Sequence, residues 1–384
     1  MPTMLPARQF SALRLADVLT SSLDAVCARP NALGLPAVRK AVIILADGLG
    51  ASSIRARAGH ARFLSSRLNK SSIIDSVFPA TTAAGIATLT TGVEPGQHGL
   101  VGYQVLDGAR DRVVNQLTGW DGEMQPATWQ RARTVFDRAA DENVPSFAIG
   151  PKRFVASGFT QAVLRGARYV PADTVADRFA AARSILSQNP TALIYLYVAE
   201  LDVAAHAHGW ESDRWLAQLE TLDSEVSRFA STLRSDEGLL LTADHGVIDV
   251  PSTRHVLFDT QPALITGVRH VAGDPRCVQL HLEPQLTAAE PSAADTLADA
   301  WRESQGDRAW VFTRAEAVAA GLYGQVAEEV LPRIGDVLIA ARKSIAYYDS
   351  RPANQKARGM IGQHGSLTDE EVRVPLIRAG AFAR

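Results

Sequence analysis

The stretch Ala41-Val-Ile-Ile-Leu-Ala46-Asp47-Gly48-Leu49-Gly50 joins an unbroken apolar run to a carboxylate and a glycine turn. Apolar runs without polar alternation are typical of strands buried on both faces of a parallel sheet. More runs of this kind end at a polar residue or a turn, and they lie at 146–149, 192–198 and 239–243. The sequence therefore predicts a mostly parallel sheet.

Helical patterns lie between these runs. From 215 to 233, apolar residues recur every three or four positions, and Ser212 is placed to cap that helix. Strands that alternate with helices predict a doubly wound α/β fold, in which helices sandwich the sheet. Ligands of such folds bind outside the carboxyl ends of the strands.

Residues 251–333 depart from this pattern. They contain an alternating apolar stretch at 277–282 and a helical piece near 295–303. We expect them to form a small inserted α+β lobe beside the site, within a single catalytic domain that spans residues 1–384. The stretches 336–341 and 344–348 are interpreted as two strands that pair with each other and return the chain to the core.

Charge and composition are ordinary for a globular chain. The formal net charge of the 384 residues is −2, which gives no reason to expect binding of a nucleic-acid polymer.

Cys27 and Cys277 are expected to be free thiols of a reducing compartment. Residues 1–10 lack the pattern of a secretory signal, and no stretch approaches the roughly 18 apolar residues of a membrane span. We expect a cytoplasmic protein without membrane association, and the sequence does not indicate its oligomeric state.

Carboxylates and imidazoles gather at the ends of the apolar runs or in glycine turns. They are Asp47, Asp202, His206, Asp244, His245 and His364. Such a set is about what two neighbouring zinc-like ions need, with positions left open for a substrate.

Each of these residues also has an ordinary interpretation. Asp202 and His206 share one face of a helical turn, where they either hold an ion or form a surface pair. Asp47 fits a turn residue, Asp244-His245 fits a polar strand end, and His364 fits a loop histidine. Their joint occurrence at strand ends and glycine turns favours a metal centre.

Thr82, in Phe78-Pro-Ala-Thr-Thr82, is the candidate nucleophile. Coordination to a divalent cation lowers the pKa of a hydroxyl and yields an alkoxide. The segment 83–91 is predicted to be helical, so Thr82 lies at a helix N-terminus, which favours a phosphate. Thr81 or Thr82 could instead be a simple N-cap, and the residues alone do not separate them. The set of carboxylates and imidazoles, together with Thr82, predicts a two-metal hydrolase of phosphate esters.

The motifs resemble the alkaline phosphatase superfamily, and within it the type I phosphodiesterase/nucleotide pyrophosphatase family. The resemblance rests on Ala46-Asp47-Gly48, on Phe78-Pro79 through Thr82 to Thr91-Gly92 and His98-Gly99, on Asp202-Val-Ala-Ala-His206, on Asp244-His245-Gly246 and on Gly362-Gln-His364-Gly365. It spans the chain from about residue 40 to the end. An alkaline phosphatase-like fold is the architecture that it implies.

The resemblance also implies the roles of the residues. One zinc ion would be held by Asp202, His206 and His364. The other would be held by Asp47, Asp244 and His245, with the Thr82 oxygen as a further ligand, and manganese is the alternative metal. Counting back from Thr91-Gly92 places Thr82 at the nucleophile position of the family.

Two positions depart from the family pattern. Gly85 stands where nucleotide pyrophosphatases usually carry an Asn, three residues after the nucleophile. Tyr103 stands where they use another Asn to hold a phosphate oxygen, so the Tyr103 phenol or the Gln104 amide is expected to bind substrate instead. Sulfatases are disfavoured because no Cys/Ser-x-Pro-x-Arg motif surrounds Thr82.

The expected function is metal-dependent hydrolysis of phosphodiester or pyrophosphate bonds in nucleotide-type small molecules, through a phosphothreonine intermediate. A phosphomonoesterase, phosphonate hydrolase or phosphomutase on the same scaffold is the nearest alternative. An alternative of another class is a non-catalytic metal-bearing binding protein, which the complete set of ligands argues against.

Overall fold

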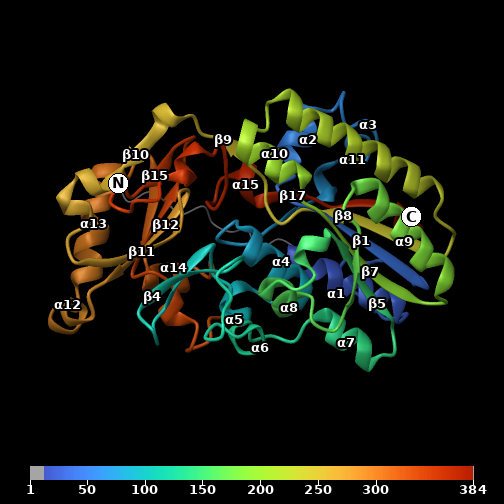
Figure 1. Cartoon of the computed structure of the whole chain (residues 1–384), viewed down its shortest axis with the longest axis horizontal. Helices are drawn as coiled ribbons and strands as arrows, with labels where there is room; N and C mark the ends of the chain where they lie inside the picture. Colours follow the sequence, from blue (N-terminus) through green and yellow to red (C-terminus); the bar gives the residue numbers. More distant parts are fainter. Residues whose placement is uncertain (1–12, 384) are drawn as a thin grey trace.

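The unbroken apolar runs form the middle of a six-stranded sheet (Figure 1). The structure, a computed structural model, describes residues 13–383. The strand order is β18 (Ile377–Gly380), β8 (Glu237–Thr242), β1 (Lys40–Ala46), β7 (Ala192–Val198), β5 (Ser146–Gly150) and β6 (Arg168–Pro171). Four neighbouring pairs are parallel and β18 runs antiparallel to β8, which confirms the mostly parallel sheet.

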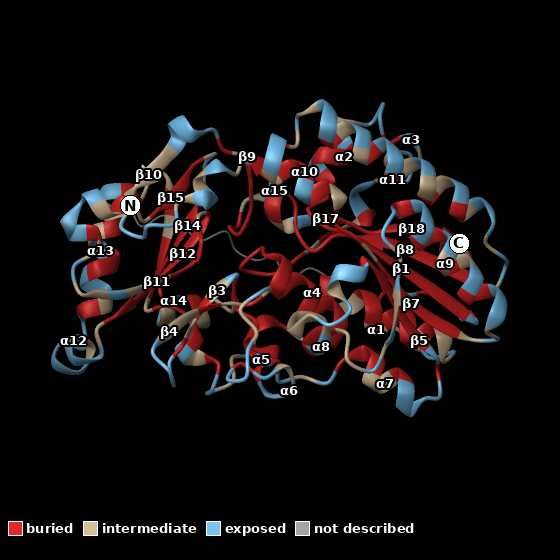
Figure 2. Ribbon diagram, in the orientation of Figure 1, coloured by how far each residue is buried: buried red, intermediate tan, exposed pale blue. Residues whose placement is uncertain are grey.

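Helices cover both faces of this sheet, as the doubly wound prediction requires. One face carries α1 (Leu15–Val26), α4 (Thr82–Thr91) and α7 (Val135–Asp141); the other carries α9 (Val175–Gln188), α10 (Glu200–His208) and α11 (Asp213–Ser231). Ser212 caps α11 by accepting the Trp215 N–H, as predicted. Every residue of β1 is buried, because helices pack on both sides of the strand (Figure 2).

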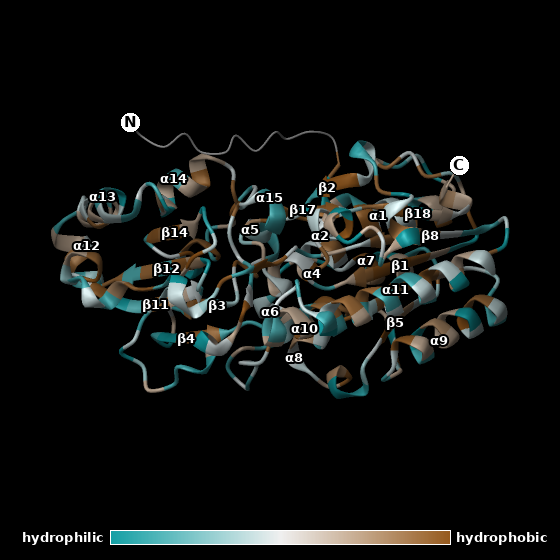
Figure 3. Cartoon of the chain, turned by 90° about the horizontal axis from the view of Figure 1, so that it is seen from above, coloured by the Kyte–Doolittle hydropathy of each residue, from teal (hydrophilic) through white to brown (hydrophobic). Residues whose placement is uncertain are grey.

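The lobe has its own sheet and its own apolar core. Its strands, in order, are β11 (Val268–Asp274), β12 (Cys277–Leu282), β14 (Val337–Ala341) and β13 (Ala309–Thr313), and its helices are α12 (Pro284–Ala289), α13 (Ala293–Gln305) and α14 (Arg314–Ala319). Leu280, Trp301 and Ile339 lie in a buried cluster separate from that of the main sheet. Figure 3 shows hydrophobic residues along β1 of the main sheet and β14 of the lobe sheet.

The structure corrects one predicted pairing. β14 lies between β12 and β13, so both of its edges are occupied. β15 (Ala346–Tyr348) pairs instead with β10 (His255–Leu257). We retain a single catalytic domain with an inserted lobe as a proposal, and β14 carries the lobe's sheet beyond the predicted end at residue 333.

Short elements complete the connections around the site. Strand pairs are β9 (Ile248–Asp249) with β16 (Gly362–Gln363), β2 (Ile73–Asp75) with β17 (Arg373–Pro375), and β3 (Gln104–Asp107) with β4 (Arg112–Asn115). The short helices are α2 (Ala51–Ala56), α3 (Arg62–Ser65), α5 (Pro95–His98), α6 (Pro126–Trp129), α8 (Gly158–Val163) and α15 (Asp369–Val372).

Three further expectations concern the termini, membranes and thiols. Residues 1–10, for which no signal is expected, lie outside the described residues. Within residues 13–383, no helix is both long and apolar enough to cross a membrane. Cys27 and Cys277 are both free.

Candidate active site

The first group of predicted ligands lies at the carboxyl ends of the adjacent strands β1 and β8. Asp47 follows β1, and Asp244 and His245 follow β8. Their candidate ligand atoms all lie within 4.8 Å of one another. His245 Nε2 is 3.4 Å from Asp47 Oδ1 and 3.6 Å from Asp244 Oδ2. All three side chains are buried, so water reaches this group poorly.

The second group combines a helix with a distant loop. Asp202 and His206 lie on one face of α10, and His364 follows β16. Their candidate ligand atoms also lie within 4.8 Å of one another. The His364 ring stacks on His245 with centroids 3.6 Å apart, which brings the two groups side by side. This group is more open, because the His206 side chain is 22% exposed.

All three imidazoles are oriented by backbone carbonyl groups. His206 Nδ1 lies 2.8 Å from the Gly362 oxygen, and His364 Nδ1 lies 2.8 Å from the Ala80 oxygen. His245 Nδ1 lies 3.2 Å from the Gly246 oxygen. A carbonyl oxygen only accepts, so each Nδ1 carries a proton, and in the neutral ring the lone pair then lies on Nε2. That is the tautomer of a histidine that binds a metal through Nε2.

The carboxylates have oxygens that no donor satisfies. Asp47 Oδ1, Asp202 Oδ1 and Asp244 Oδ2 are enclosed and lack a hydrogen-bond partner among the described residues. Burial raises the pKa of Asp47 well above its usual value, and the charges of Asp244 and Asp202 raise it further. Burial likewise raises the pKa of Asp244. Enclosed carboxylates without donors are costly unless a cation neutralises them, so these residues fit divalent ions.

The two threonines are separated by their contacts. Thr81 is the N-cap of α4, and its hydroxyl oxygen accepts the Ala84 N–H at 3.4 Å. Thr82 is the first helical residue, and its Oγ1 lies 3.1 Å from His245 Nε2. Only the Thr82 hydroxyl of the pair therefore contacts a predicted ligand.

Glycines allow the close approach of elements around the first group. A Cβ on Gly85 would lie 2.6 Å from the Asp244 Cβ, so α4 packs directly on the loop after β8. A Cβ on Gly48 would lie 3.0 Å from Asp202 Oδ1, and Gly48 has a φ of +72°. Gly85 stands where the family usually carries Asn, and the close packing of α4 on Asp244 leaves no room for a side chain at this position.

Sequence reasoning missed Tyr197, which orients a predicted ligand. The Tyr197 O–H donates to Asp47 Oδ2 at 2.5 Å, which leaves Asp47 Oδ1 facing His245. Burial, followed by the nearby Asp47 charge, raises the pKa of Tyr197 well above its usual value, so this phenol stays protonated as a donor. Tyr197 lies inside the apolar run of β7. The sequence could have indicated it, because a phenol O–H in a buried strand needs a hydrogen-bond partner.

Tyr103 and Gln104 lie at the start of the β3–β4 hairpin, beside the lobe. Both line a cavity that also includes Asp274 of β11, a residue that sequence reasoning did not single out. Burial raises the pKa of Asp274 to about 7, and the nearby backbone N–H of Tyr103 acts against that rise. Thus the predicted substrate-binding pair faces the junction between core and lobe.

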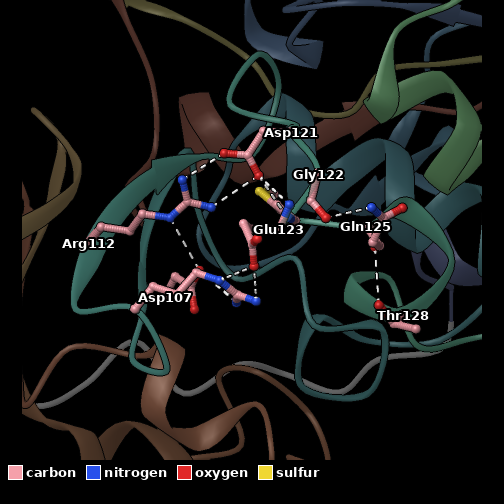
Figure 4. Close-up of polar contacts among 9 residues, drawn as sticks. Asp107, Arg112, Asp121, Gly122, Glu123, Gln125 and Thr128 are labelled. Atoms are coloured by element: carbon pink, nitrogen blue, oxygen red, sulfur yellow. Dashed lines mark hydrogen bonds and ion pairs between the residues drawn. The ribbon is translucent and has the colours of Figure 1, made fainter.

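Ion pairs fix the hairpin to the loop that follows it. Figure 4 shows Arg112 of β4 between Asp121 and Asp107. The Arg112 Nη1–Asp121 Oδ2 distance is 2.6 Å. Asp121 also accepts the N–H groups of Glu123 and Met124. These contacts hold the turn end of the hairpin, where β3 ends at Asp107 and β4 begins at Arg112. Gln104 lies at the opposite end, where β3 begins.

A second cavity opens next to the candidate nucleophile. Its volume is about 590 Å³, and Thr82 contributes to its wall. Most of its other walls are aromatic or apolar, and they include Leu117, Trp120, Phe154, Phe159, Tyr169 and Tyr197. Arg153 supplies a cation at the same wall. A cavity of this size and lining suits an organic group with a flat ring.

Comparison with known proteins identifies the family and the fold. The family model for type I phosphodiesterase/nucleotide pyrophosphatase matches residues 41–367. The alkaline phosphatase PhoK of a Sphingomonas species is 26% identical over 223 residues, which cover 50% of this chain and 39% of that protein. The match therefore spans less than half of the length of that relative.

Solved structures share the fold. Murine ectonucleotide pyrophosphatase/phosphodiesterase 5 has a TM-score of 0.66 at 16% identity, over 89% of this chain and 88% of that one. An inactive variant of the murine protein in complex with AMP gives 0.68 at 15% identity, over the same shares of each chain. The human protein gives 0.65 at 14% identity, again over 89% and 88%. The alkaline phosphatase-like fold is therefore confirmed, and the chain belongs to the type I phosphodiesterase/nucleotide pyrophosphatase family, a family of phosphoester hydrolases.

Proposed function

We propose that this protein hydrolyses phosphodiester or pyrophosphate bonds in nucleotide-type small molecules through a phosphothreonine formed on Thr82. The observation that carries the proposal is the Thr82 hydroxyl, 3.1 Å from His245 Nε2 at the N-terminus of α4. Two groups of ligand-type side chains lie beside that hydroxyl. A location in the cytoplasm, without membrane or nucleic-acid partners, stays a prediction.

The proposed cofactors are two divalent cations, zinc first and manganese second. Asp202, His206 and His364 would hold one, and Asp47, Asp244 and His245 the other, with Thr82 as a further ligand of the latter. When bound, such ions supply Lewis-acid charge, which lowers the pKa of the nucleophile and stabilises negative charge on phosphate oxygens. The unpartnered carboxylate oxygens support this assignment, as do the Nδ1 contacts to backbone oxygens, which leave Nε2 of each ring for an ion.

The residues of this chain then have separate tasks. The Thr82 oxygen attacks phosphorus, and the bond from phosphorus to the leaving oxygen breaks. Water then attacks the phosphothreonine, which releases the phosphate product and restores the Thr82 hydroxyl. Thr81 already accepts the Ala84 N–H, so the N–H groups of Thr82 and Ala83 and the helix dipole are the features of α4 that favour the phosphoryl oxygens.

The aromatic cavity supports a diester over a monoester. Thr82 contributes to its wall, so the organic substituent that stays on phosphorus has a place next to the nucleophile. Trp120, Phe154 and Tyr197 offer ring faces on which a nucleobase can stack. The murine structural relative was solved in complex with AMP, a nucleotide.

A phosphomonoesterase is the second candidate, and Arg153 favours it. A monoester carries an extra negative charge, which needs a cation near the nucleophile. Arg153 lines the same cavity as Thr82, and the Sphingomonas relative is named an alkaline phosphatase. Arg153 and Phe154 form a cation–π contact, with the guanidinium carbon 4.7 Å from the ring centroid, which places the cation against the aromatic wall.

Substrate comparison tests the proposal. We expect kcat/KM to be higher for bis-p-nitrophenyl phosphate and p-nitrophenyl thymidine 5′-monophosphate than for p-nitrophenyl phosphate. An Arg153→Gln variant should leave this order unchanged. A preference for the monoester that disappears in Arg153→Gln would replace the diester assignment by the monoesterase.

A further inference from the structure

Arg178, near the start of α9, is a buried cation whose guanidinium group contacts several separate segments. Its side chain is 1% exposed. Nε donates to the Ala172 oxygen at 3.0 Å, and Nη2 donates to the Asp173 oxygen at 2.6 Å, both in the loop that joins β6 to α9. Nη1 donates to the Tyr197 oxygen of β7 at 3.2 Å. Arg178 therefore joins its own helix to the loop before it and to the neighbouring strand β7.

The remaining guanidinium donors bind the carboxylate of Glu200. Nη1 lies 2.9 Å from Glu200 Oε2, and Nη2 lies 2.7 Å from Oε1, so the pair is bidentate. Every N–H group of Arg178 thus has an acceptor, in the planar fork geometry that only arginine provides. A bidentate pair of this kind fixes the orientation as well as the distance of its two partners.

Glu200 is the first residue of α10, the helix that carries two predicted ligands. Its N-cap is Ala199, whose side chain makes no capping hydrogen bond. The bond from Arg178 therefore holds the start of the helix where a side-chain cap is absent. Asp202 and His206 follow on the next turns of the same helix, so a displacement of its start would move both side chains.

We propose that Arg178 is a positioning residue, which fixes the start of α10 through Glu200 and thereby holds Asp202 and His206 at the spacing that binds a metal ion. This inference rests on the proposed function, because it concerns ligands of the same centre. Arg178 is enclosed and does not line the cavity beside Thr82, so its role is to orient ligands and not to contact substrate.

Arg183, on the same helix α9, offers a matched control. Its guanidinium group also forms a bidentate pair, with Glu237 oxygens at 2.8 and 2.7 Å, and it donates to the Thr232 oxygen at 3.2 Å. Glu237 is the first residue of β8, whereas the predicted ligands Asp244 and His245 follow the last residue of that strand. Loss of Arg183 therefore removes a similar ion pair at the opposite edge of the sheet.

Zinc affinity, measured by competition with a chelator, tests the proposal. We expect Arg178→Gln and Glu200→Ala each to weaken the binding of one of the two ions about 10- to 100-fold, as is typical when a partner that orients a ligand is lost. Arg178→Lys should lose less, because lysine keeps the charge but not the fork of donors. Arg183→Gln should change the zinc affinity by less than about twofold, although denaturant titration should show a similar loss of stability.

A double variant and a partly exposed partner keep the test decisive. Arg178→Gln combined with Glu200→Ala should lose no more zinc affinity than the larger single loss, because both changes remove one contact. If Arg178→Gln does not fold, Glu200→Ala carries the test, since the Glu200 side chain is 28% exposed. Zinc affinity equal to that of the wild type in the Arg178 and Glu200 variants would overturn the inference, and so would an equal loss in Arg183→Gln.

Failure of the proposed function would be recognised separately. If the wild type binds two ions but hydrolyses no phosphoester, the proposed function fails, and the zinc affinities still decide the role of Arg178. If the wild type binds no zinc, hydrogen exchange of the metal-free protein decides it. Faster exchange of the α10 amides in Arg178→Gln than in Arg183→Gln supports the inference, and equal exchange refutes it.

Discussion

The core sheet and the lobe contribute to the candidate site in different ways. Asp47, Asp244 and His245 follow core strands, and α10 places Asp202 and His206 beside them. The described strands of the lobe sheet contribute no member to either ligand group. The lobe instead brings Asp274 and Arg276 against the loops that surround the centre. From this comparison we propose that the core carries the reacting groups and that the lobe influences which substrates bind.

A buried ion pair joins the two regions. Arg276, at the turn after β11, donates to both carboxylate oxygens of Glu371, at 3.1 and 2.6 Å. Glu371 also accepts the Ser366 N–H at 2.9 Å, two residues after His364. Its backbone oxygen accepts the Gly246 N–H at 2.8 Å, one residue after His245. Through Glu371, the lobe supports the loops of both ligand groups.

The largest expected effect comes from the core. We expect Thr82→Ala to lower kcat by about 10³-fold or more, because the attacking oxygen is lost. Metal content should stay close to that of the wild type, since the carboxylates and imidazoles remain. Steady-state kinetics and elemental analysis of the same preparation measure both quantities.

Two neighbouring variants serve as controls for Thr82. Thr82→Ser keeps a hydroxyl and should retain part of the activity. Thr81→Ala removes an N-cap and should cost about 1 kcal/mol of unfolding free energy, with kcat nearly unchanged. An inactive Thr81→Ala beside an active Thr82→Ala would show that the nucleophile was wrongly assigned.

The next effect comes from the link between core and lobe. Arg276→Met removes one partner of a fully buried pair, so we expect it to lower the free energy of unfolding by about 3–5 kcal/mol. The folded protein should keep more activity than Thr82→Ala, because no reacting group is lost. Denaturant titration and kcat at a temperature where the variant is folded test this. If the variant were as stable as the wild type, the Arg276–Glu371 pair would not stabilise the junction between the core and the lobe, and our interpretation would be wrong.

A smaller effect is expected at Tyr197. Tyr197→Phe removes the donor to Asp47 Oδ2 and leaves the ring in the aromatic wall. Loss of a partner that orients a ligand typically weakens metal binding about 10- to 100-fold. Competition with a chelator measures this change, and Tyr169→Phe, which lines the same cavity without contacting a ligand, is the matched control. Equal metal affinity in the two variants would contradict the orienting role.

Much of the core could be predicted because its signals are local. The unbroken run of 41–46 became β1, and the apolar spacing after Ser212 became α11. Asp47 and Asp244 could be found because each follows such a run, and a glycine comes one residue after Asp47 and two residues after Asp244. The division of the ligands into two groups came from the family resemblance, and in the structure the side chains of each group lie close together.

The lobe was harder to predict because its contacts are long-range. The stretches 336–341 and 344–348 look like a hairpin, but β12 and β13 occupy both edges of β14. Asp274, before Pro275, looks like an ordinary turn residue, and its approach to Tyr103 depends on how the lobe folds back. No local pattern encodes that approach.

The metal content of the protein tests the central claim most directly. Protein purified without chelators should contain about two transition-metal ions per chain, mainly zinc, because two groups of three ligands lie side by side. Elemental analysis by mass spectrometry gives this number. Protein without bound metal that gains no phosphoester hydrolysis when zinc or manganese is added would contradict the account.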